Sequence, residues 1–236
     1  MRIHRISVVA AAFAAVMLLL GALAPKVAHA DPKKDIQQKM KEAMENYDLL
    51  EYEEARKLLN SALIFSPAGK VIERYHKIQL AERWPQAGDH LSVFKIDGVP
   101  CSVIICHDER YPELVRLPVL AGAQVVFYIS HESGVREEHK IGPYRAQIQA
   151  RAVENTVFVV HANAPANPDT SGSHGHSRII APDGNIAHEA TVFGEDVMIE
   201  TLDLKKASRA NAVNSIKRGP LGDWWKDGVK RVRMIE

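Results

Sequence analysis

Cys106 is the residue whose position in this sequence most suggests covalent chemistry. It follows an apolar run, Cys101–Ile105, and stands shortly before the helix-favouring segment that begins at Pro112. Where a strand turns into a helix, backbone N–H groups and the positive end of the helix stabilise a thiolate and a developing oxyanion. The pattern predicts a nucleophilic cysteine, with a buried core thiol as the alternative.

The spacing of the two cysteines excludes one alternative, a disulfide between them. Cys101 and Cys106 are five residues apart on one expected strand, so their Cα atoms should lie roughly 16 Å apart. A disulfide tolerates at most about 7 Å between Cα atoms. Two cysteines also cannot build a disulfide-dense scaffold. A free thiol at a strand-to-helix turn is better explained as a nucleophile than as packing.

Histidines form the second group of reactive side chains. His161, His174 and His176 could suggest a metal site, but no Cys/His set in the chain has the spacing of metal ligands. We therefore expect neither a metal nor a cofactor.

The elements that must position Cys106 lie between about Ser66 and the end of the chain. Short apolar runs alternate there with Gly and Pro turn signals, a pattern typical of an α/β fold with a layered core. A segment of 170 residues, 67–236, can bury such a core. The expected strands are Leu91–Ile96, Cys101–Ile105, Gln124–Ile129, Thr156–His161, Ser177–Ile180 and Val197–Leu202, and the expected helices are Pro112–Ala121 and Pro143–Glu154.

Residues 31–65 have a helical character instead. Apolar residues recur there at spacings of three and four, and neither Gly nor Pro occurs from Lys33 to Leu63. The string from Tyr47 to Leu63 is similar to a single tetratricopeptide repeat, although one helix pair cannot bury both its faces alone. We expect either an amphipathic helical hairpin that packs on the nearest surface or a module that binds a protein partner.

Residues 1–30 have the features of an export signal. Two arginines open the chain, an uncharged apolar run extends from about Ile6 to Ala24, and Ala28-His29-Ala30 forms a cleavage-type end. This predicts a secreted or periplasmic protein. A membrane anchor formed by the uncleaved run is the alternative, because about 19 apolar residues can just cross a bilayer.

The charge balance argues against a nucleic-acid partner. The chain has 30 Lys and Arg against 29 Asp and Glu. Residues 1–30 hold three of the basic residues and no acid, so their removal leaves 27 basic against 29 acidic residues. No basic excess points to DNA, RNA or anionic lipid.

A family resemblance connects these features. The string Cys106-His-Asp-Glu-Arg-Tyr-Pro-Glu113 resembles the nucleophile motif of the carbon–nitrogen hydrolase (nitrilase) superfamily. Upstream, Tyr75-His-Lys77-Ile-Gln-Leu80 is similar to the family's Tyr-x-Lys-x-x-Leu segment. Further blocks follow in the family's order at Ala150–Asn155, Val159–Asn163 and Gly175–Gly184. The resemblance covers about residues 67–236.

The resemblance implies an α-β-β-α sandwich that hydrolyses a small amide, carbamoyl compound or nitrile through a cysteine thioester. Cys106 would be the nucleophile, and Lys77 with the His107 backbone N–H would stabilise the tetrahedral oxygen. Glu82 would orient Lys77. His131 and Glu132 stand where family members line the substrate site. Family members also associate through their C-terminal regions, which implies a homo-oligomer contacting through Trp224 and Trp225.

The chain departs from the family before Lys77. The family's first third supplies strands, helices and the Glu that acts as general base, whereas this chain has the apparent signal and helical hairpin there. We therefore expect an incomplete nitrilase-like sandwich over residues 67–236, with activity impaired by loss of the base. The alternatives are an inactive fusion that serves as an interaction module, and a recombined chain that does not fold stably alone.

Overall fold

The computed structural model describes residues 4–9, 18–21, 59–83, 85–132, 138–166, 173–191, 196–225 and 230. The expected helical hairpin falls mostly at residues 31–58, outside the described residues, and so stays a prediction. No helix of the described ranges is long and apolar enough to span a membrane.

A six-stranded sheet forms the centre of the fold, with the strand order β10-β9-β8-β7-β6-β5. The three middle strands β6, β7 and β8 are parallel, and the outer pairings are antiparallel. The strands are β5 (Phe94–Ile96), β6 (Val99–Ile105), β7 (Val125–Ser130), β8 (Phe158–Asn163), β9 (Arg178–Ile180) and β10 (Ile186–Glu189).

The middle strands are parallel because helices connect them. Every residue of β7 and β8 is buried, as expected for parallel strands covered on both faces. Helix α2 (Pro112–Ala121) links β6 to β7, and α3 (Glu138–Val153) links β7 to β8. Helix α2 has the bounds predicted from the sequence. Helix α3 begins five residues before the predicted start at Pro143, which lies inside the helix.

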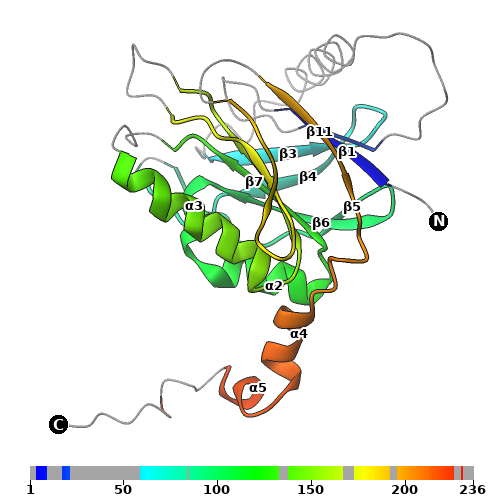
Figure 1. Ribbon diagram of the computed structural model, residues 1–236, viewed down its shortest axis with the longest axis vertical. Helices are drawn as coiled ribbons and strands as arrows, with labels where there is room; N and C mark the ends of the chain where they lie inside the picture. Colours follow the sequence, from blue (N-terminus) through cyan, green and yellow to red (C-terminus); the bar gives the residue numbers. More distant parts are fainter. Residues whose placement is uncertain are drawn as a thin grey trace.

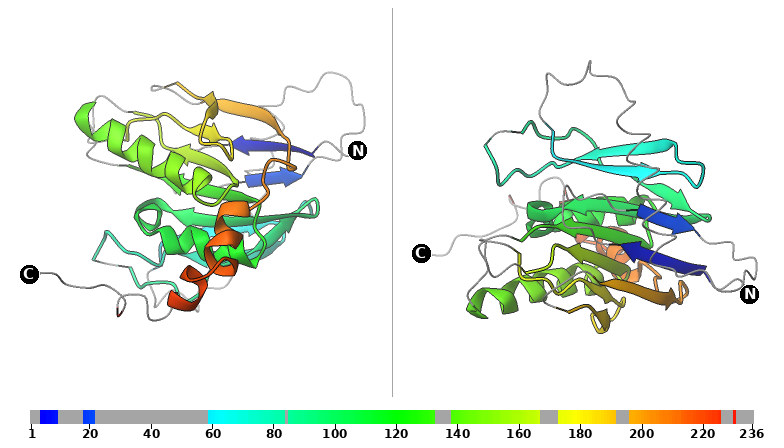
Figure 2. Two further views of the ribbon diagram at one scale, coloured as in Figure 1. Left: turned by 60° about the horizontal axis from the view of Figure 1, so that its bottom comes forward. Right: turned by 90° about the horizontal axis from the view of Figure 1, so that it is seen from above.

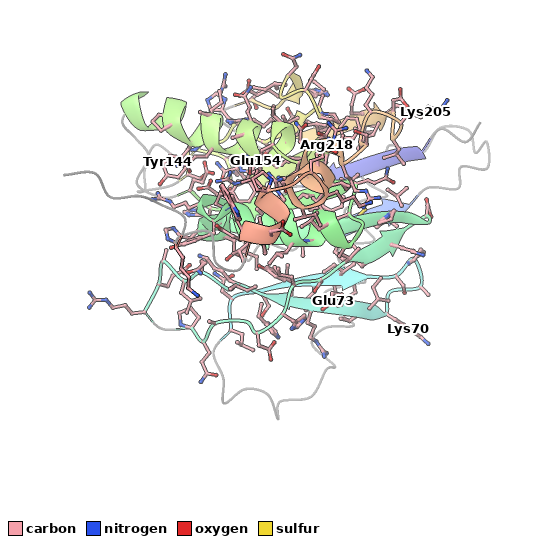
Figure 3. All side chains as sticks on the ribbon, turned by 90° about the horizontal axis from the view of Figure 1, so that it is seen from below. Lys70, Glu73, Tyr144, Glu154, Lys205 and Arg218 are labelled. Carbon is pink, nitrogen blue, oxygen red and sulfur yellow. The ribbon has the colours of Figure 1, made fainter. Side chains whose placement is uncertain are left out.

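Each face of the central sheet has its own hydrophobic core. One core contains Ile104, Val126 and Ile148 and lies beneath α2 and α3. The other contains Val103, Phe127 and residues of a separate two-stranded sheet. Figures 1 and 2 show the resulting order of helices, central sheet and strand pair. Figure 3 shows Glu154, at the end of α3, and Glu73, on the strand pair, on opposite sides of the central sheet.

The separate strand pair corrects one prediction. Strands β3 (Ser61–Phe65) and β4 (Val71–His76) form an antiparallel hairpin, whereas the sequence predicted helix through Leu63. Ala62 and Ile64 are buried in the core between the sheets, the alternation of a strand with one covered face. Gly69, in the turn, has a φ of 75°, a conformation that favours glycine. The segment around residue 67 is therefore the turn of this hairpin.

The two ends of the described chain add a three-stranded sheet and two short helices. Strand β1 (His4–Val9) pairs with β2 (Leu18–Gly21) and with β11 (Val197–Leu202), so residues of the expected signal form strands. Signal cleavage is not tested by this pairing and stays a prediction. Helices α4 (Ala210–Lys217) and α5 (Leu221–Trp224) follow β11. Trp224 and Trp225 are exposed there, and self-association through them also stays a prediction.

The loop after β4 leaves no room for a side chain at Gly88. The Gly88 N–H donates to the Lys77 carbonyl at 2.8 Å, and a Cβ on Gly88 would stand 2.2 Å from the His76 carbonyl oxygen. We expect Gly88→Ala to lower the free energy of unfolding by about 1–3 kcal/mol, because the backbone at His76 must move. Urea unfolding measures this. Ala87→Ser, an exposed change in the same loop, should leave stability nearly unchanged; equal stability of the two variants would contradict the prediction.

Candidate active site

Cys106 stands at the carboxyl end of β6, where the chain changes direction. It is the first residue of a short 3₁₀ helix, η2 (Cys106–Arg110), and its φ is +46°. A residue with a Cβ rarely adopts this left-handed conformation, which is found preferentially at functional sites. Strand β6 therefore delivers the thiol at the edge of the sheet where parallel strands end, the usual position of a site in such sheets.

The surroundings of Cys106 act on its thiol in opposite directions. Burial raises the pKa of Cys106, and the Lys77 ammonium is the strongest influence that lowers it. The carboxylates of Glu132 and Glu82 raise the pKa further, while a hydrogen bond from the His107 backbone N–H lowers it. The net pKa is above the ordinary value for cysteine. The thiol is thus predominantly protonated at neutral pH and needs a proton acceptor to react.

Lys77 follows β4 and is completely buried. Its Nζ donates to both carboxylate oxygens of Glu82, at 3.0 and 2.9 Å. Asn60 Nδ2 donates to the same carboxylate at 3.3 Å. Burial raises the pKa of Glu82, but the hydrogen bond from Lys77, the charge of Lys77 and the backbone N–H groups of Glu82 and Ala81 together outweigh it, so that pKa lies below the usual value. Glu82 is therefore an anion that fixes the direction of the Lys77 ammonium.

Glu132 is a second carboxylate near the thiol and, unlike Glu82, is buried. It accepts a hydrogen bond from the Tyr128 hydroxyl at 2.8 Å and another from His174 Nε2, and its backbone N–H donates to Asn163 Oδ1 at 3.2 Å. Burial raises the pKa of Glu132, yet the hydrogen bonds from His174 and Tyr128 help to hold it at about 2. Glu132 is therefore ionised across the physiological range and is a weak proton acceptor.

Tyr128 and His161 connect this carboxylate to the sheet. The two residues lie opposite each other on β7 and β8, and their rings stack with centroids 4.5 Å apart. His161 Nε2 makes a 2.8 Å hydrogen bond with Ser130 Oγ. Burial lowers the pKa of His161 to about 3, so this imidazole is neutral. The stacked pair is a rigid, uncharged support for Glu132.

Glu109 is another buried acid, one turn of η2 beyond Cys106. Its side chain is buried and lies 3.8 Å from Arg110 Nε. Burial raises the pKa of Glu109 to about 7, and the charge of Glu132 adds to this rise, while Arg110 and Arg151 oppose it. Its protonation therefore changes near neutral pH.

The structure brings together most of the residues that the sequence indicated. Cys106, Lys77, Glu82 and Glu132 interact at the ends of β4, β6 and β7, and the His107 N–H faces the Cys106 sulfur. His131 is exposed, in contrast to the buried Glu132 beside it. Sequence reasoning missed His174 and Asn163 as partners of Glu132, because hydrogen bonds between distant segments leave no local pattern. It also missed Tyr128, which is only four residues away but reaches Glu132 from within strand β7. No group of His, Cys, Asp and Glu in the described ranges could hold a metal ion.

Comparison with known proteins identifies this arrangement. The model of the family described as carbon-nitrogen hydrolase matches residues 41–212. The chain belongs to the carbon–nitrogen hydrolase family. This confirms the resemblance and the nitrilase-like mixed α/β fold, and it moves the start of the similarity from residue 67 to residue 41. The predicted start of the carbon–nitrogen hydrolase region at residue 67 was therefore too late, and residues 61–65, interpreted as the end of a helix, form strand β3.

Several carbon–nitrogen hydrolases are similar to the chain over most of its length. The 2-oxoglutaramate amidase of Bacillus subtilis is 34% identical over 155 residues, which are 63% of this chain and 58% of that protein. Nit3 of Saccharomyces cerevisiae, a nitrilase superfamily member, is 27% identical with a TM-score of 0.62, over 71% of this chain and 61% of Nit3.

A further structure shows a modified cysteine in a relative. It is a single-residue variant of the amidase from Nesterenkonia sp. AN1, in which acrylamide has added to the active-site cysteine. It is 25% identical with a TM-score of 0.56, over 68% of this chain and 61% of that one. The chain spans less than two thirds of the length of the curated relatives it matches.

The buried acid Glu109 predicts how stability depends on pH. Its folded pKa of about 7 exceeds the ordinary value of 4.5, so its contribution to stability is complete below pH 4.5 and is lost as pH rises through 7. We expect Glu109→Gln to unfold with about 3 kcal/mol more free energy than the unsubstituted protein at pH 8, and with the same free energy at about pH 4.

Urea unfolding at the two pH values checks this expectation. Glu113→Gln, a change at an exposed acid of α2, is the matched control and should shift stability by no more than about 0.5 kcal/mol at either pH. A Glu109→Gln effect that is equal at the acidic and the alkaline pH would show that burial does not perturb this carboxyl.

Proposed function

We propose that this chain hydrolyses the carbon–nitrogen bond of a small amide or carbamoyl compound through a thioester on Cys106. The observation that carries the proposal is the left-handed Cys106 at the end of β6, with the buried Lys77 ammonium as the strongest positive influence on its thiol. Membership of the carbon–nitrogen hydrolase family and similarity to proteins named as amidases support this reaction class, and they favour an amide over a nitrile.

The reaction begins with the thiol. As the Cys106 sulfur bonds to the carbonyl carbon, the π electrons move onto the carbonyl oxygen, and the thiol proton passes through solvent water to the amide nitrogen. The Lys77 ammonium and the His107 N–H stabilise the resulting oxyanion. The carbon–nitrogen bond then breaks, and ammonia or amine leaves with the proton. Water attacks the thioester in the same manner, releasing the carboxylic acid and regenerating the thiol.

The remaining predicted residues have supporting roles. Glu82 holds the Lys77 ammonium by two hydrogen bonds, which keeps this cation from turning toward another acceptor. His131 and Glu132 would line the substrate site at the end of β7. Because Glu132 is already bonded to Tyr128 and His174, we propose that it shapes the site and does not accept the proton of Cys106.

The rate of this reaction depends on the general base. In the family, a Glu from the first third of the domain serves as the general base. We assign the role of general base to no residue of this chain. General-base catalysis contributes about 10²–10⁴-fold, so we propose an activity reduced by about that factor. The second candidate function is an inactive interaction module, which the exposed aromatic pair Trp224 and Trp225 favours as a contact surface.

Release of ammonia tests the proposed function. We expect turnover of at least one member of a panel that contains simple amides, carbamoyl compounds and ω-amides of dicarboxylic acids. Cys106→Ala should abolish this turnover, and Lys77→Met should lower kcat/KM about 10²–10³-fold because an oxyanion donor is lost.

Two matched controls accompany these variants. Cys101→Ala removes the other thiol, which is buried in the core, and Lys95→Met removes an exposed lysine on β5. Both should retain activity. Equal activity of Cys106→Ala and the unsubstituted protein would refute the mechanism, and no turnover across the panel would favour the inactive module.

A further inference from the structure

Asp108 is a fully buried carboxylate that accepts four hydrogen bonds. Its Oδ1 accepts from the backbone N–H of Ile78 at 3.2 Å and of Gln79 at 2.7 Å. Its Oδ2 accepts from the Tyr75 hydroxyl at 2.8 Å and from the Ile105 N–H at 3.1 Å. Both oxygens are thus fully used, and the carboxylate has no capacity left for a substrate.

The four donors belong to two segments that are far apart in sequence. Three come from residues 75–79, which surround Lys77, and the fourth is the residue directly before Cys106. These segments belong to different sheets, because β3 and β4 form a pair of their own and β6 lies in the six-stranded sheet. The Asp108 side chain therefore joins the two sheets at the point where each presents its reactive residue.

The segment that carries Lys77 needs such a connection. Beyond β4 it has no regular structure, and its own backbone bonds lead back to Asn60 and Gly88 in the same part of the chain. Those bonds fix Lys77 relative to β3 and β4 but not relative to Cys106. Apolar packing between the sheets is not directional, whereas hydrogen bonds to a charged acceptor are short and directional.

We propose that Asp108 is a positioning residue that sets the distance between the Lys77 ammonium and the Cys106 thiol. The inference rests on the proposed function, and it assigns Asp108 no contact with the substrate. Asp108 acts through the backbone of both segments. Its one carboxylate binds the N–H groups of residues 78 and 79, next to Lys77, and the N–H of residue 105, next to Cys106. An asparagine would keep one acceptor oxygen, but its amide would place N–H groups against the Ile105 N–H or the two donors of residues 78 and 79.

The pH dependence of Cys106 alkylation by iodoacetamide tests this inference without a substrate. The groups that act on the thiol are Lys77, Glu132, Glu82 and the His107 N–H, and Lys77 is the strongest of those that lower its pKa. We expect Asp108→Asn to raise the pH of half-maximal alkylation by about one unit, since the loss of a close opposite charge has an effect of that size. Asp108→Ala should raise it further.

Two controls separate positioning from general destabilisation. Tyr75→Phe removes one of the four hydrogen bonds, and it should raise the pH of half-maximal alkylation by a smaller amount than Asp108→Asn does. If Asp108→Asn does not fold, Tyr75→Phe tests the inference in its place. Val115→Ala destabilises the core beneath α2 without contact with this carboxylate and should leave the profile unchanged. Unchanged profiles in folded Asp108→Asn and Tyr75→Phe, or an equal shift in Val115→Ala, would overturn the inference.

Turnover supplies an independent measurement. With any amide that the protein hydrolyses, Asp108→Asn should lower kcat about 10²-fold with a much smaller change in KM, because misplacement by about 1 Å has this effect. If the unsubstituted protein hydrolyses no amide while the alkylation profiles shift as expected, the proposed function fails and the positioning by Asp108 stands. A change in KM alone, with kcat unchanged, would contradict positioning.

Discussion

The left-handed backbone of Cys106 is the constraint on which the site depends. With a φ of +46° the residue is in a region that costs about 1–2 kcal/mol for a side chain with a Cβ. The surroundings of β6 impose this conformation, because the strand is buried and paired on both sides and η2 must begin at once for α2 to cover the sheet. The turn presents the thiol and the following N–H to the same side, and these are the groups we propose as nucleophile and oxyanion donor.

A second sheet supplies the positive charge. Lys77 comes from the β3–β4 pair, and its ammonium is buried against Glu82. A buried cation is stable only where it is paired and hydrogen-bonded, which Glu82 provides. Burial strengthens the electrostatic attraction of the Lys77 ammonium for a thiolate at Cys106, which lowers the pKa of the thiol. Burial of the thiol itself raises the same pKa. The two effects oppose each other, so small changes in the position of Lys77 alter the reactivity of Cys106.

Sequence reasoning succeeded where the signal was local. Helix α2 was predicted with its bounds because Pro112 starts it and Gly122 ends it, and β6 and β7 were apparent as apolar runs. It failed where the apolar residues fit both a helix and a strand. The residues near Leu63 match the spacing of three and four of a helix as well as they match a strand with one covered face. The site was predicted from motifs as Cys106 and Lys77. The bonds from Ile78 to Asp108 and from His174 to Glu132 join segments 30 or more residues apart and became visible only in the fold.

Trapping the covalent intermediate tests the central claim most directly. The protein is mixed with an amide that it hydrolyses, quenched rapidly in acid, and digested for mass spectrometry. The mechanism predicts the acyl group of the amide, without its nitrogen, on the peptide that contains Cys106, and its absence from Cys101. Hydrolysis with no acylated Cys106 at any time point, or an acyl group on Cys101 alone, would contradict the account.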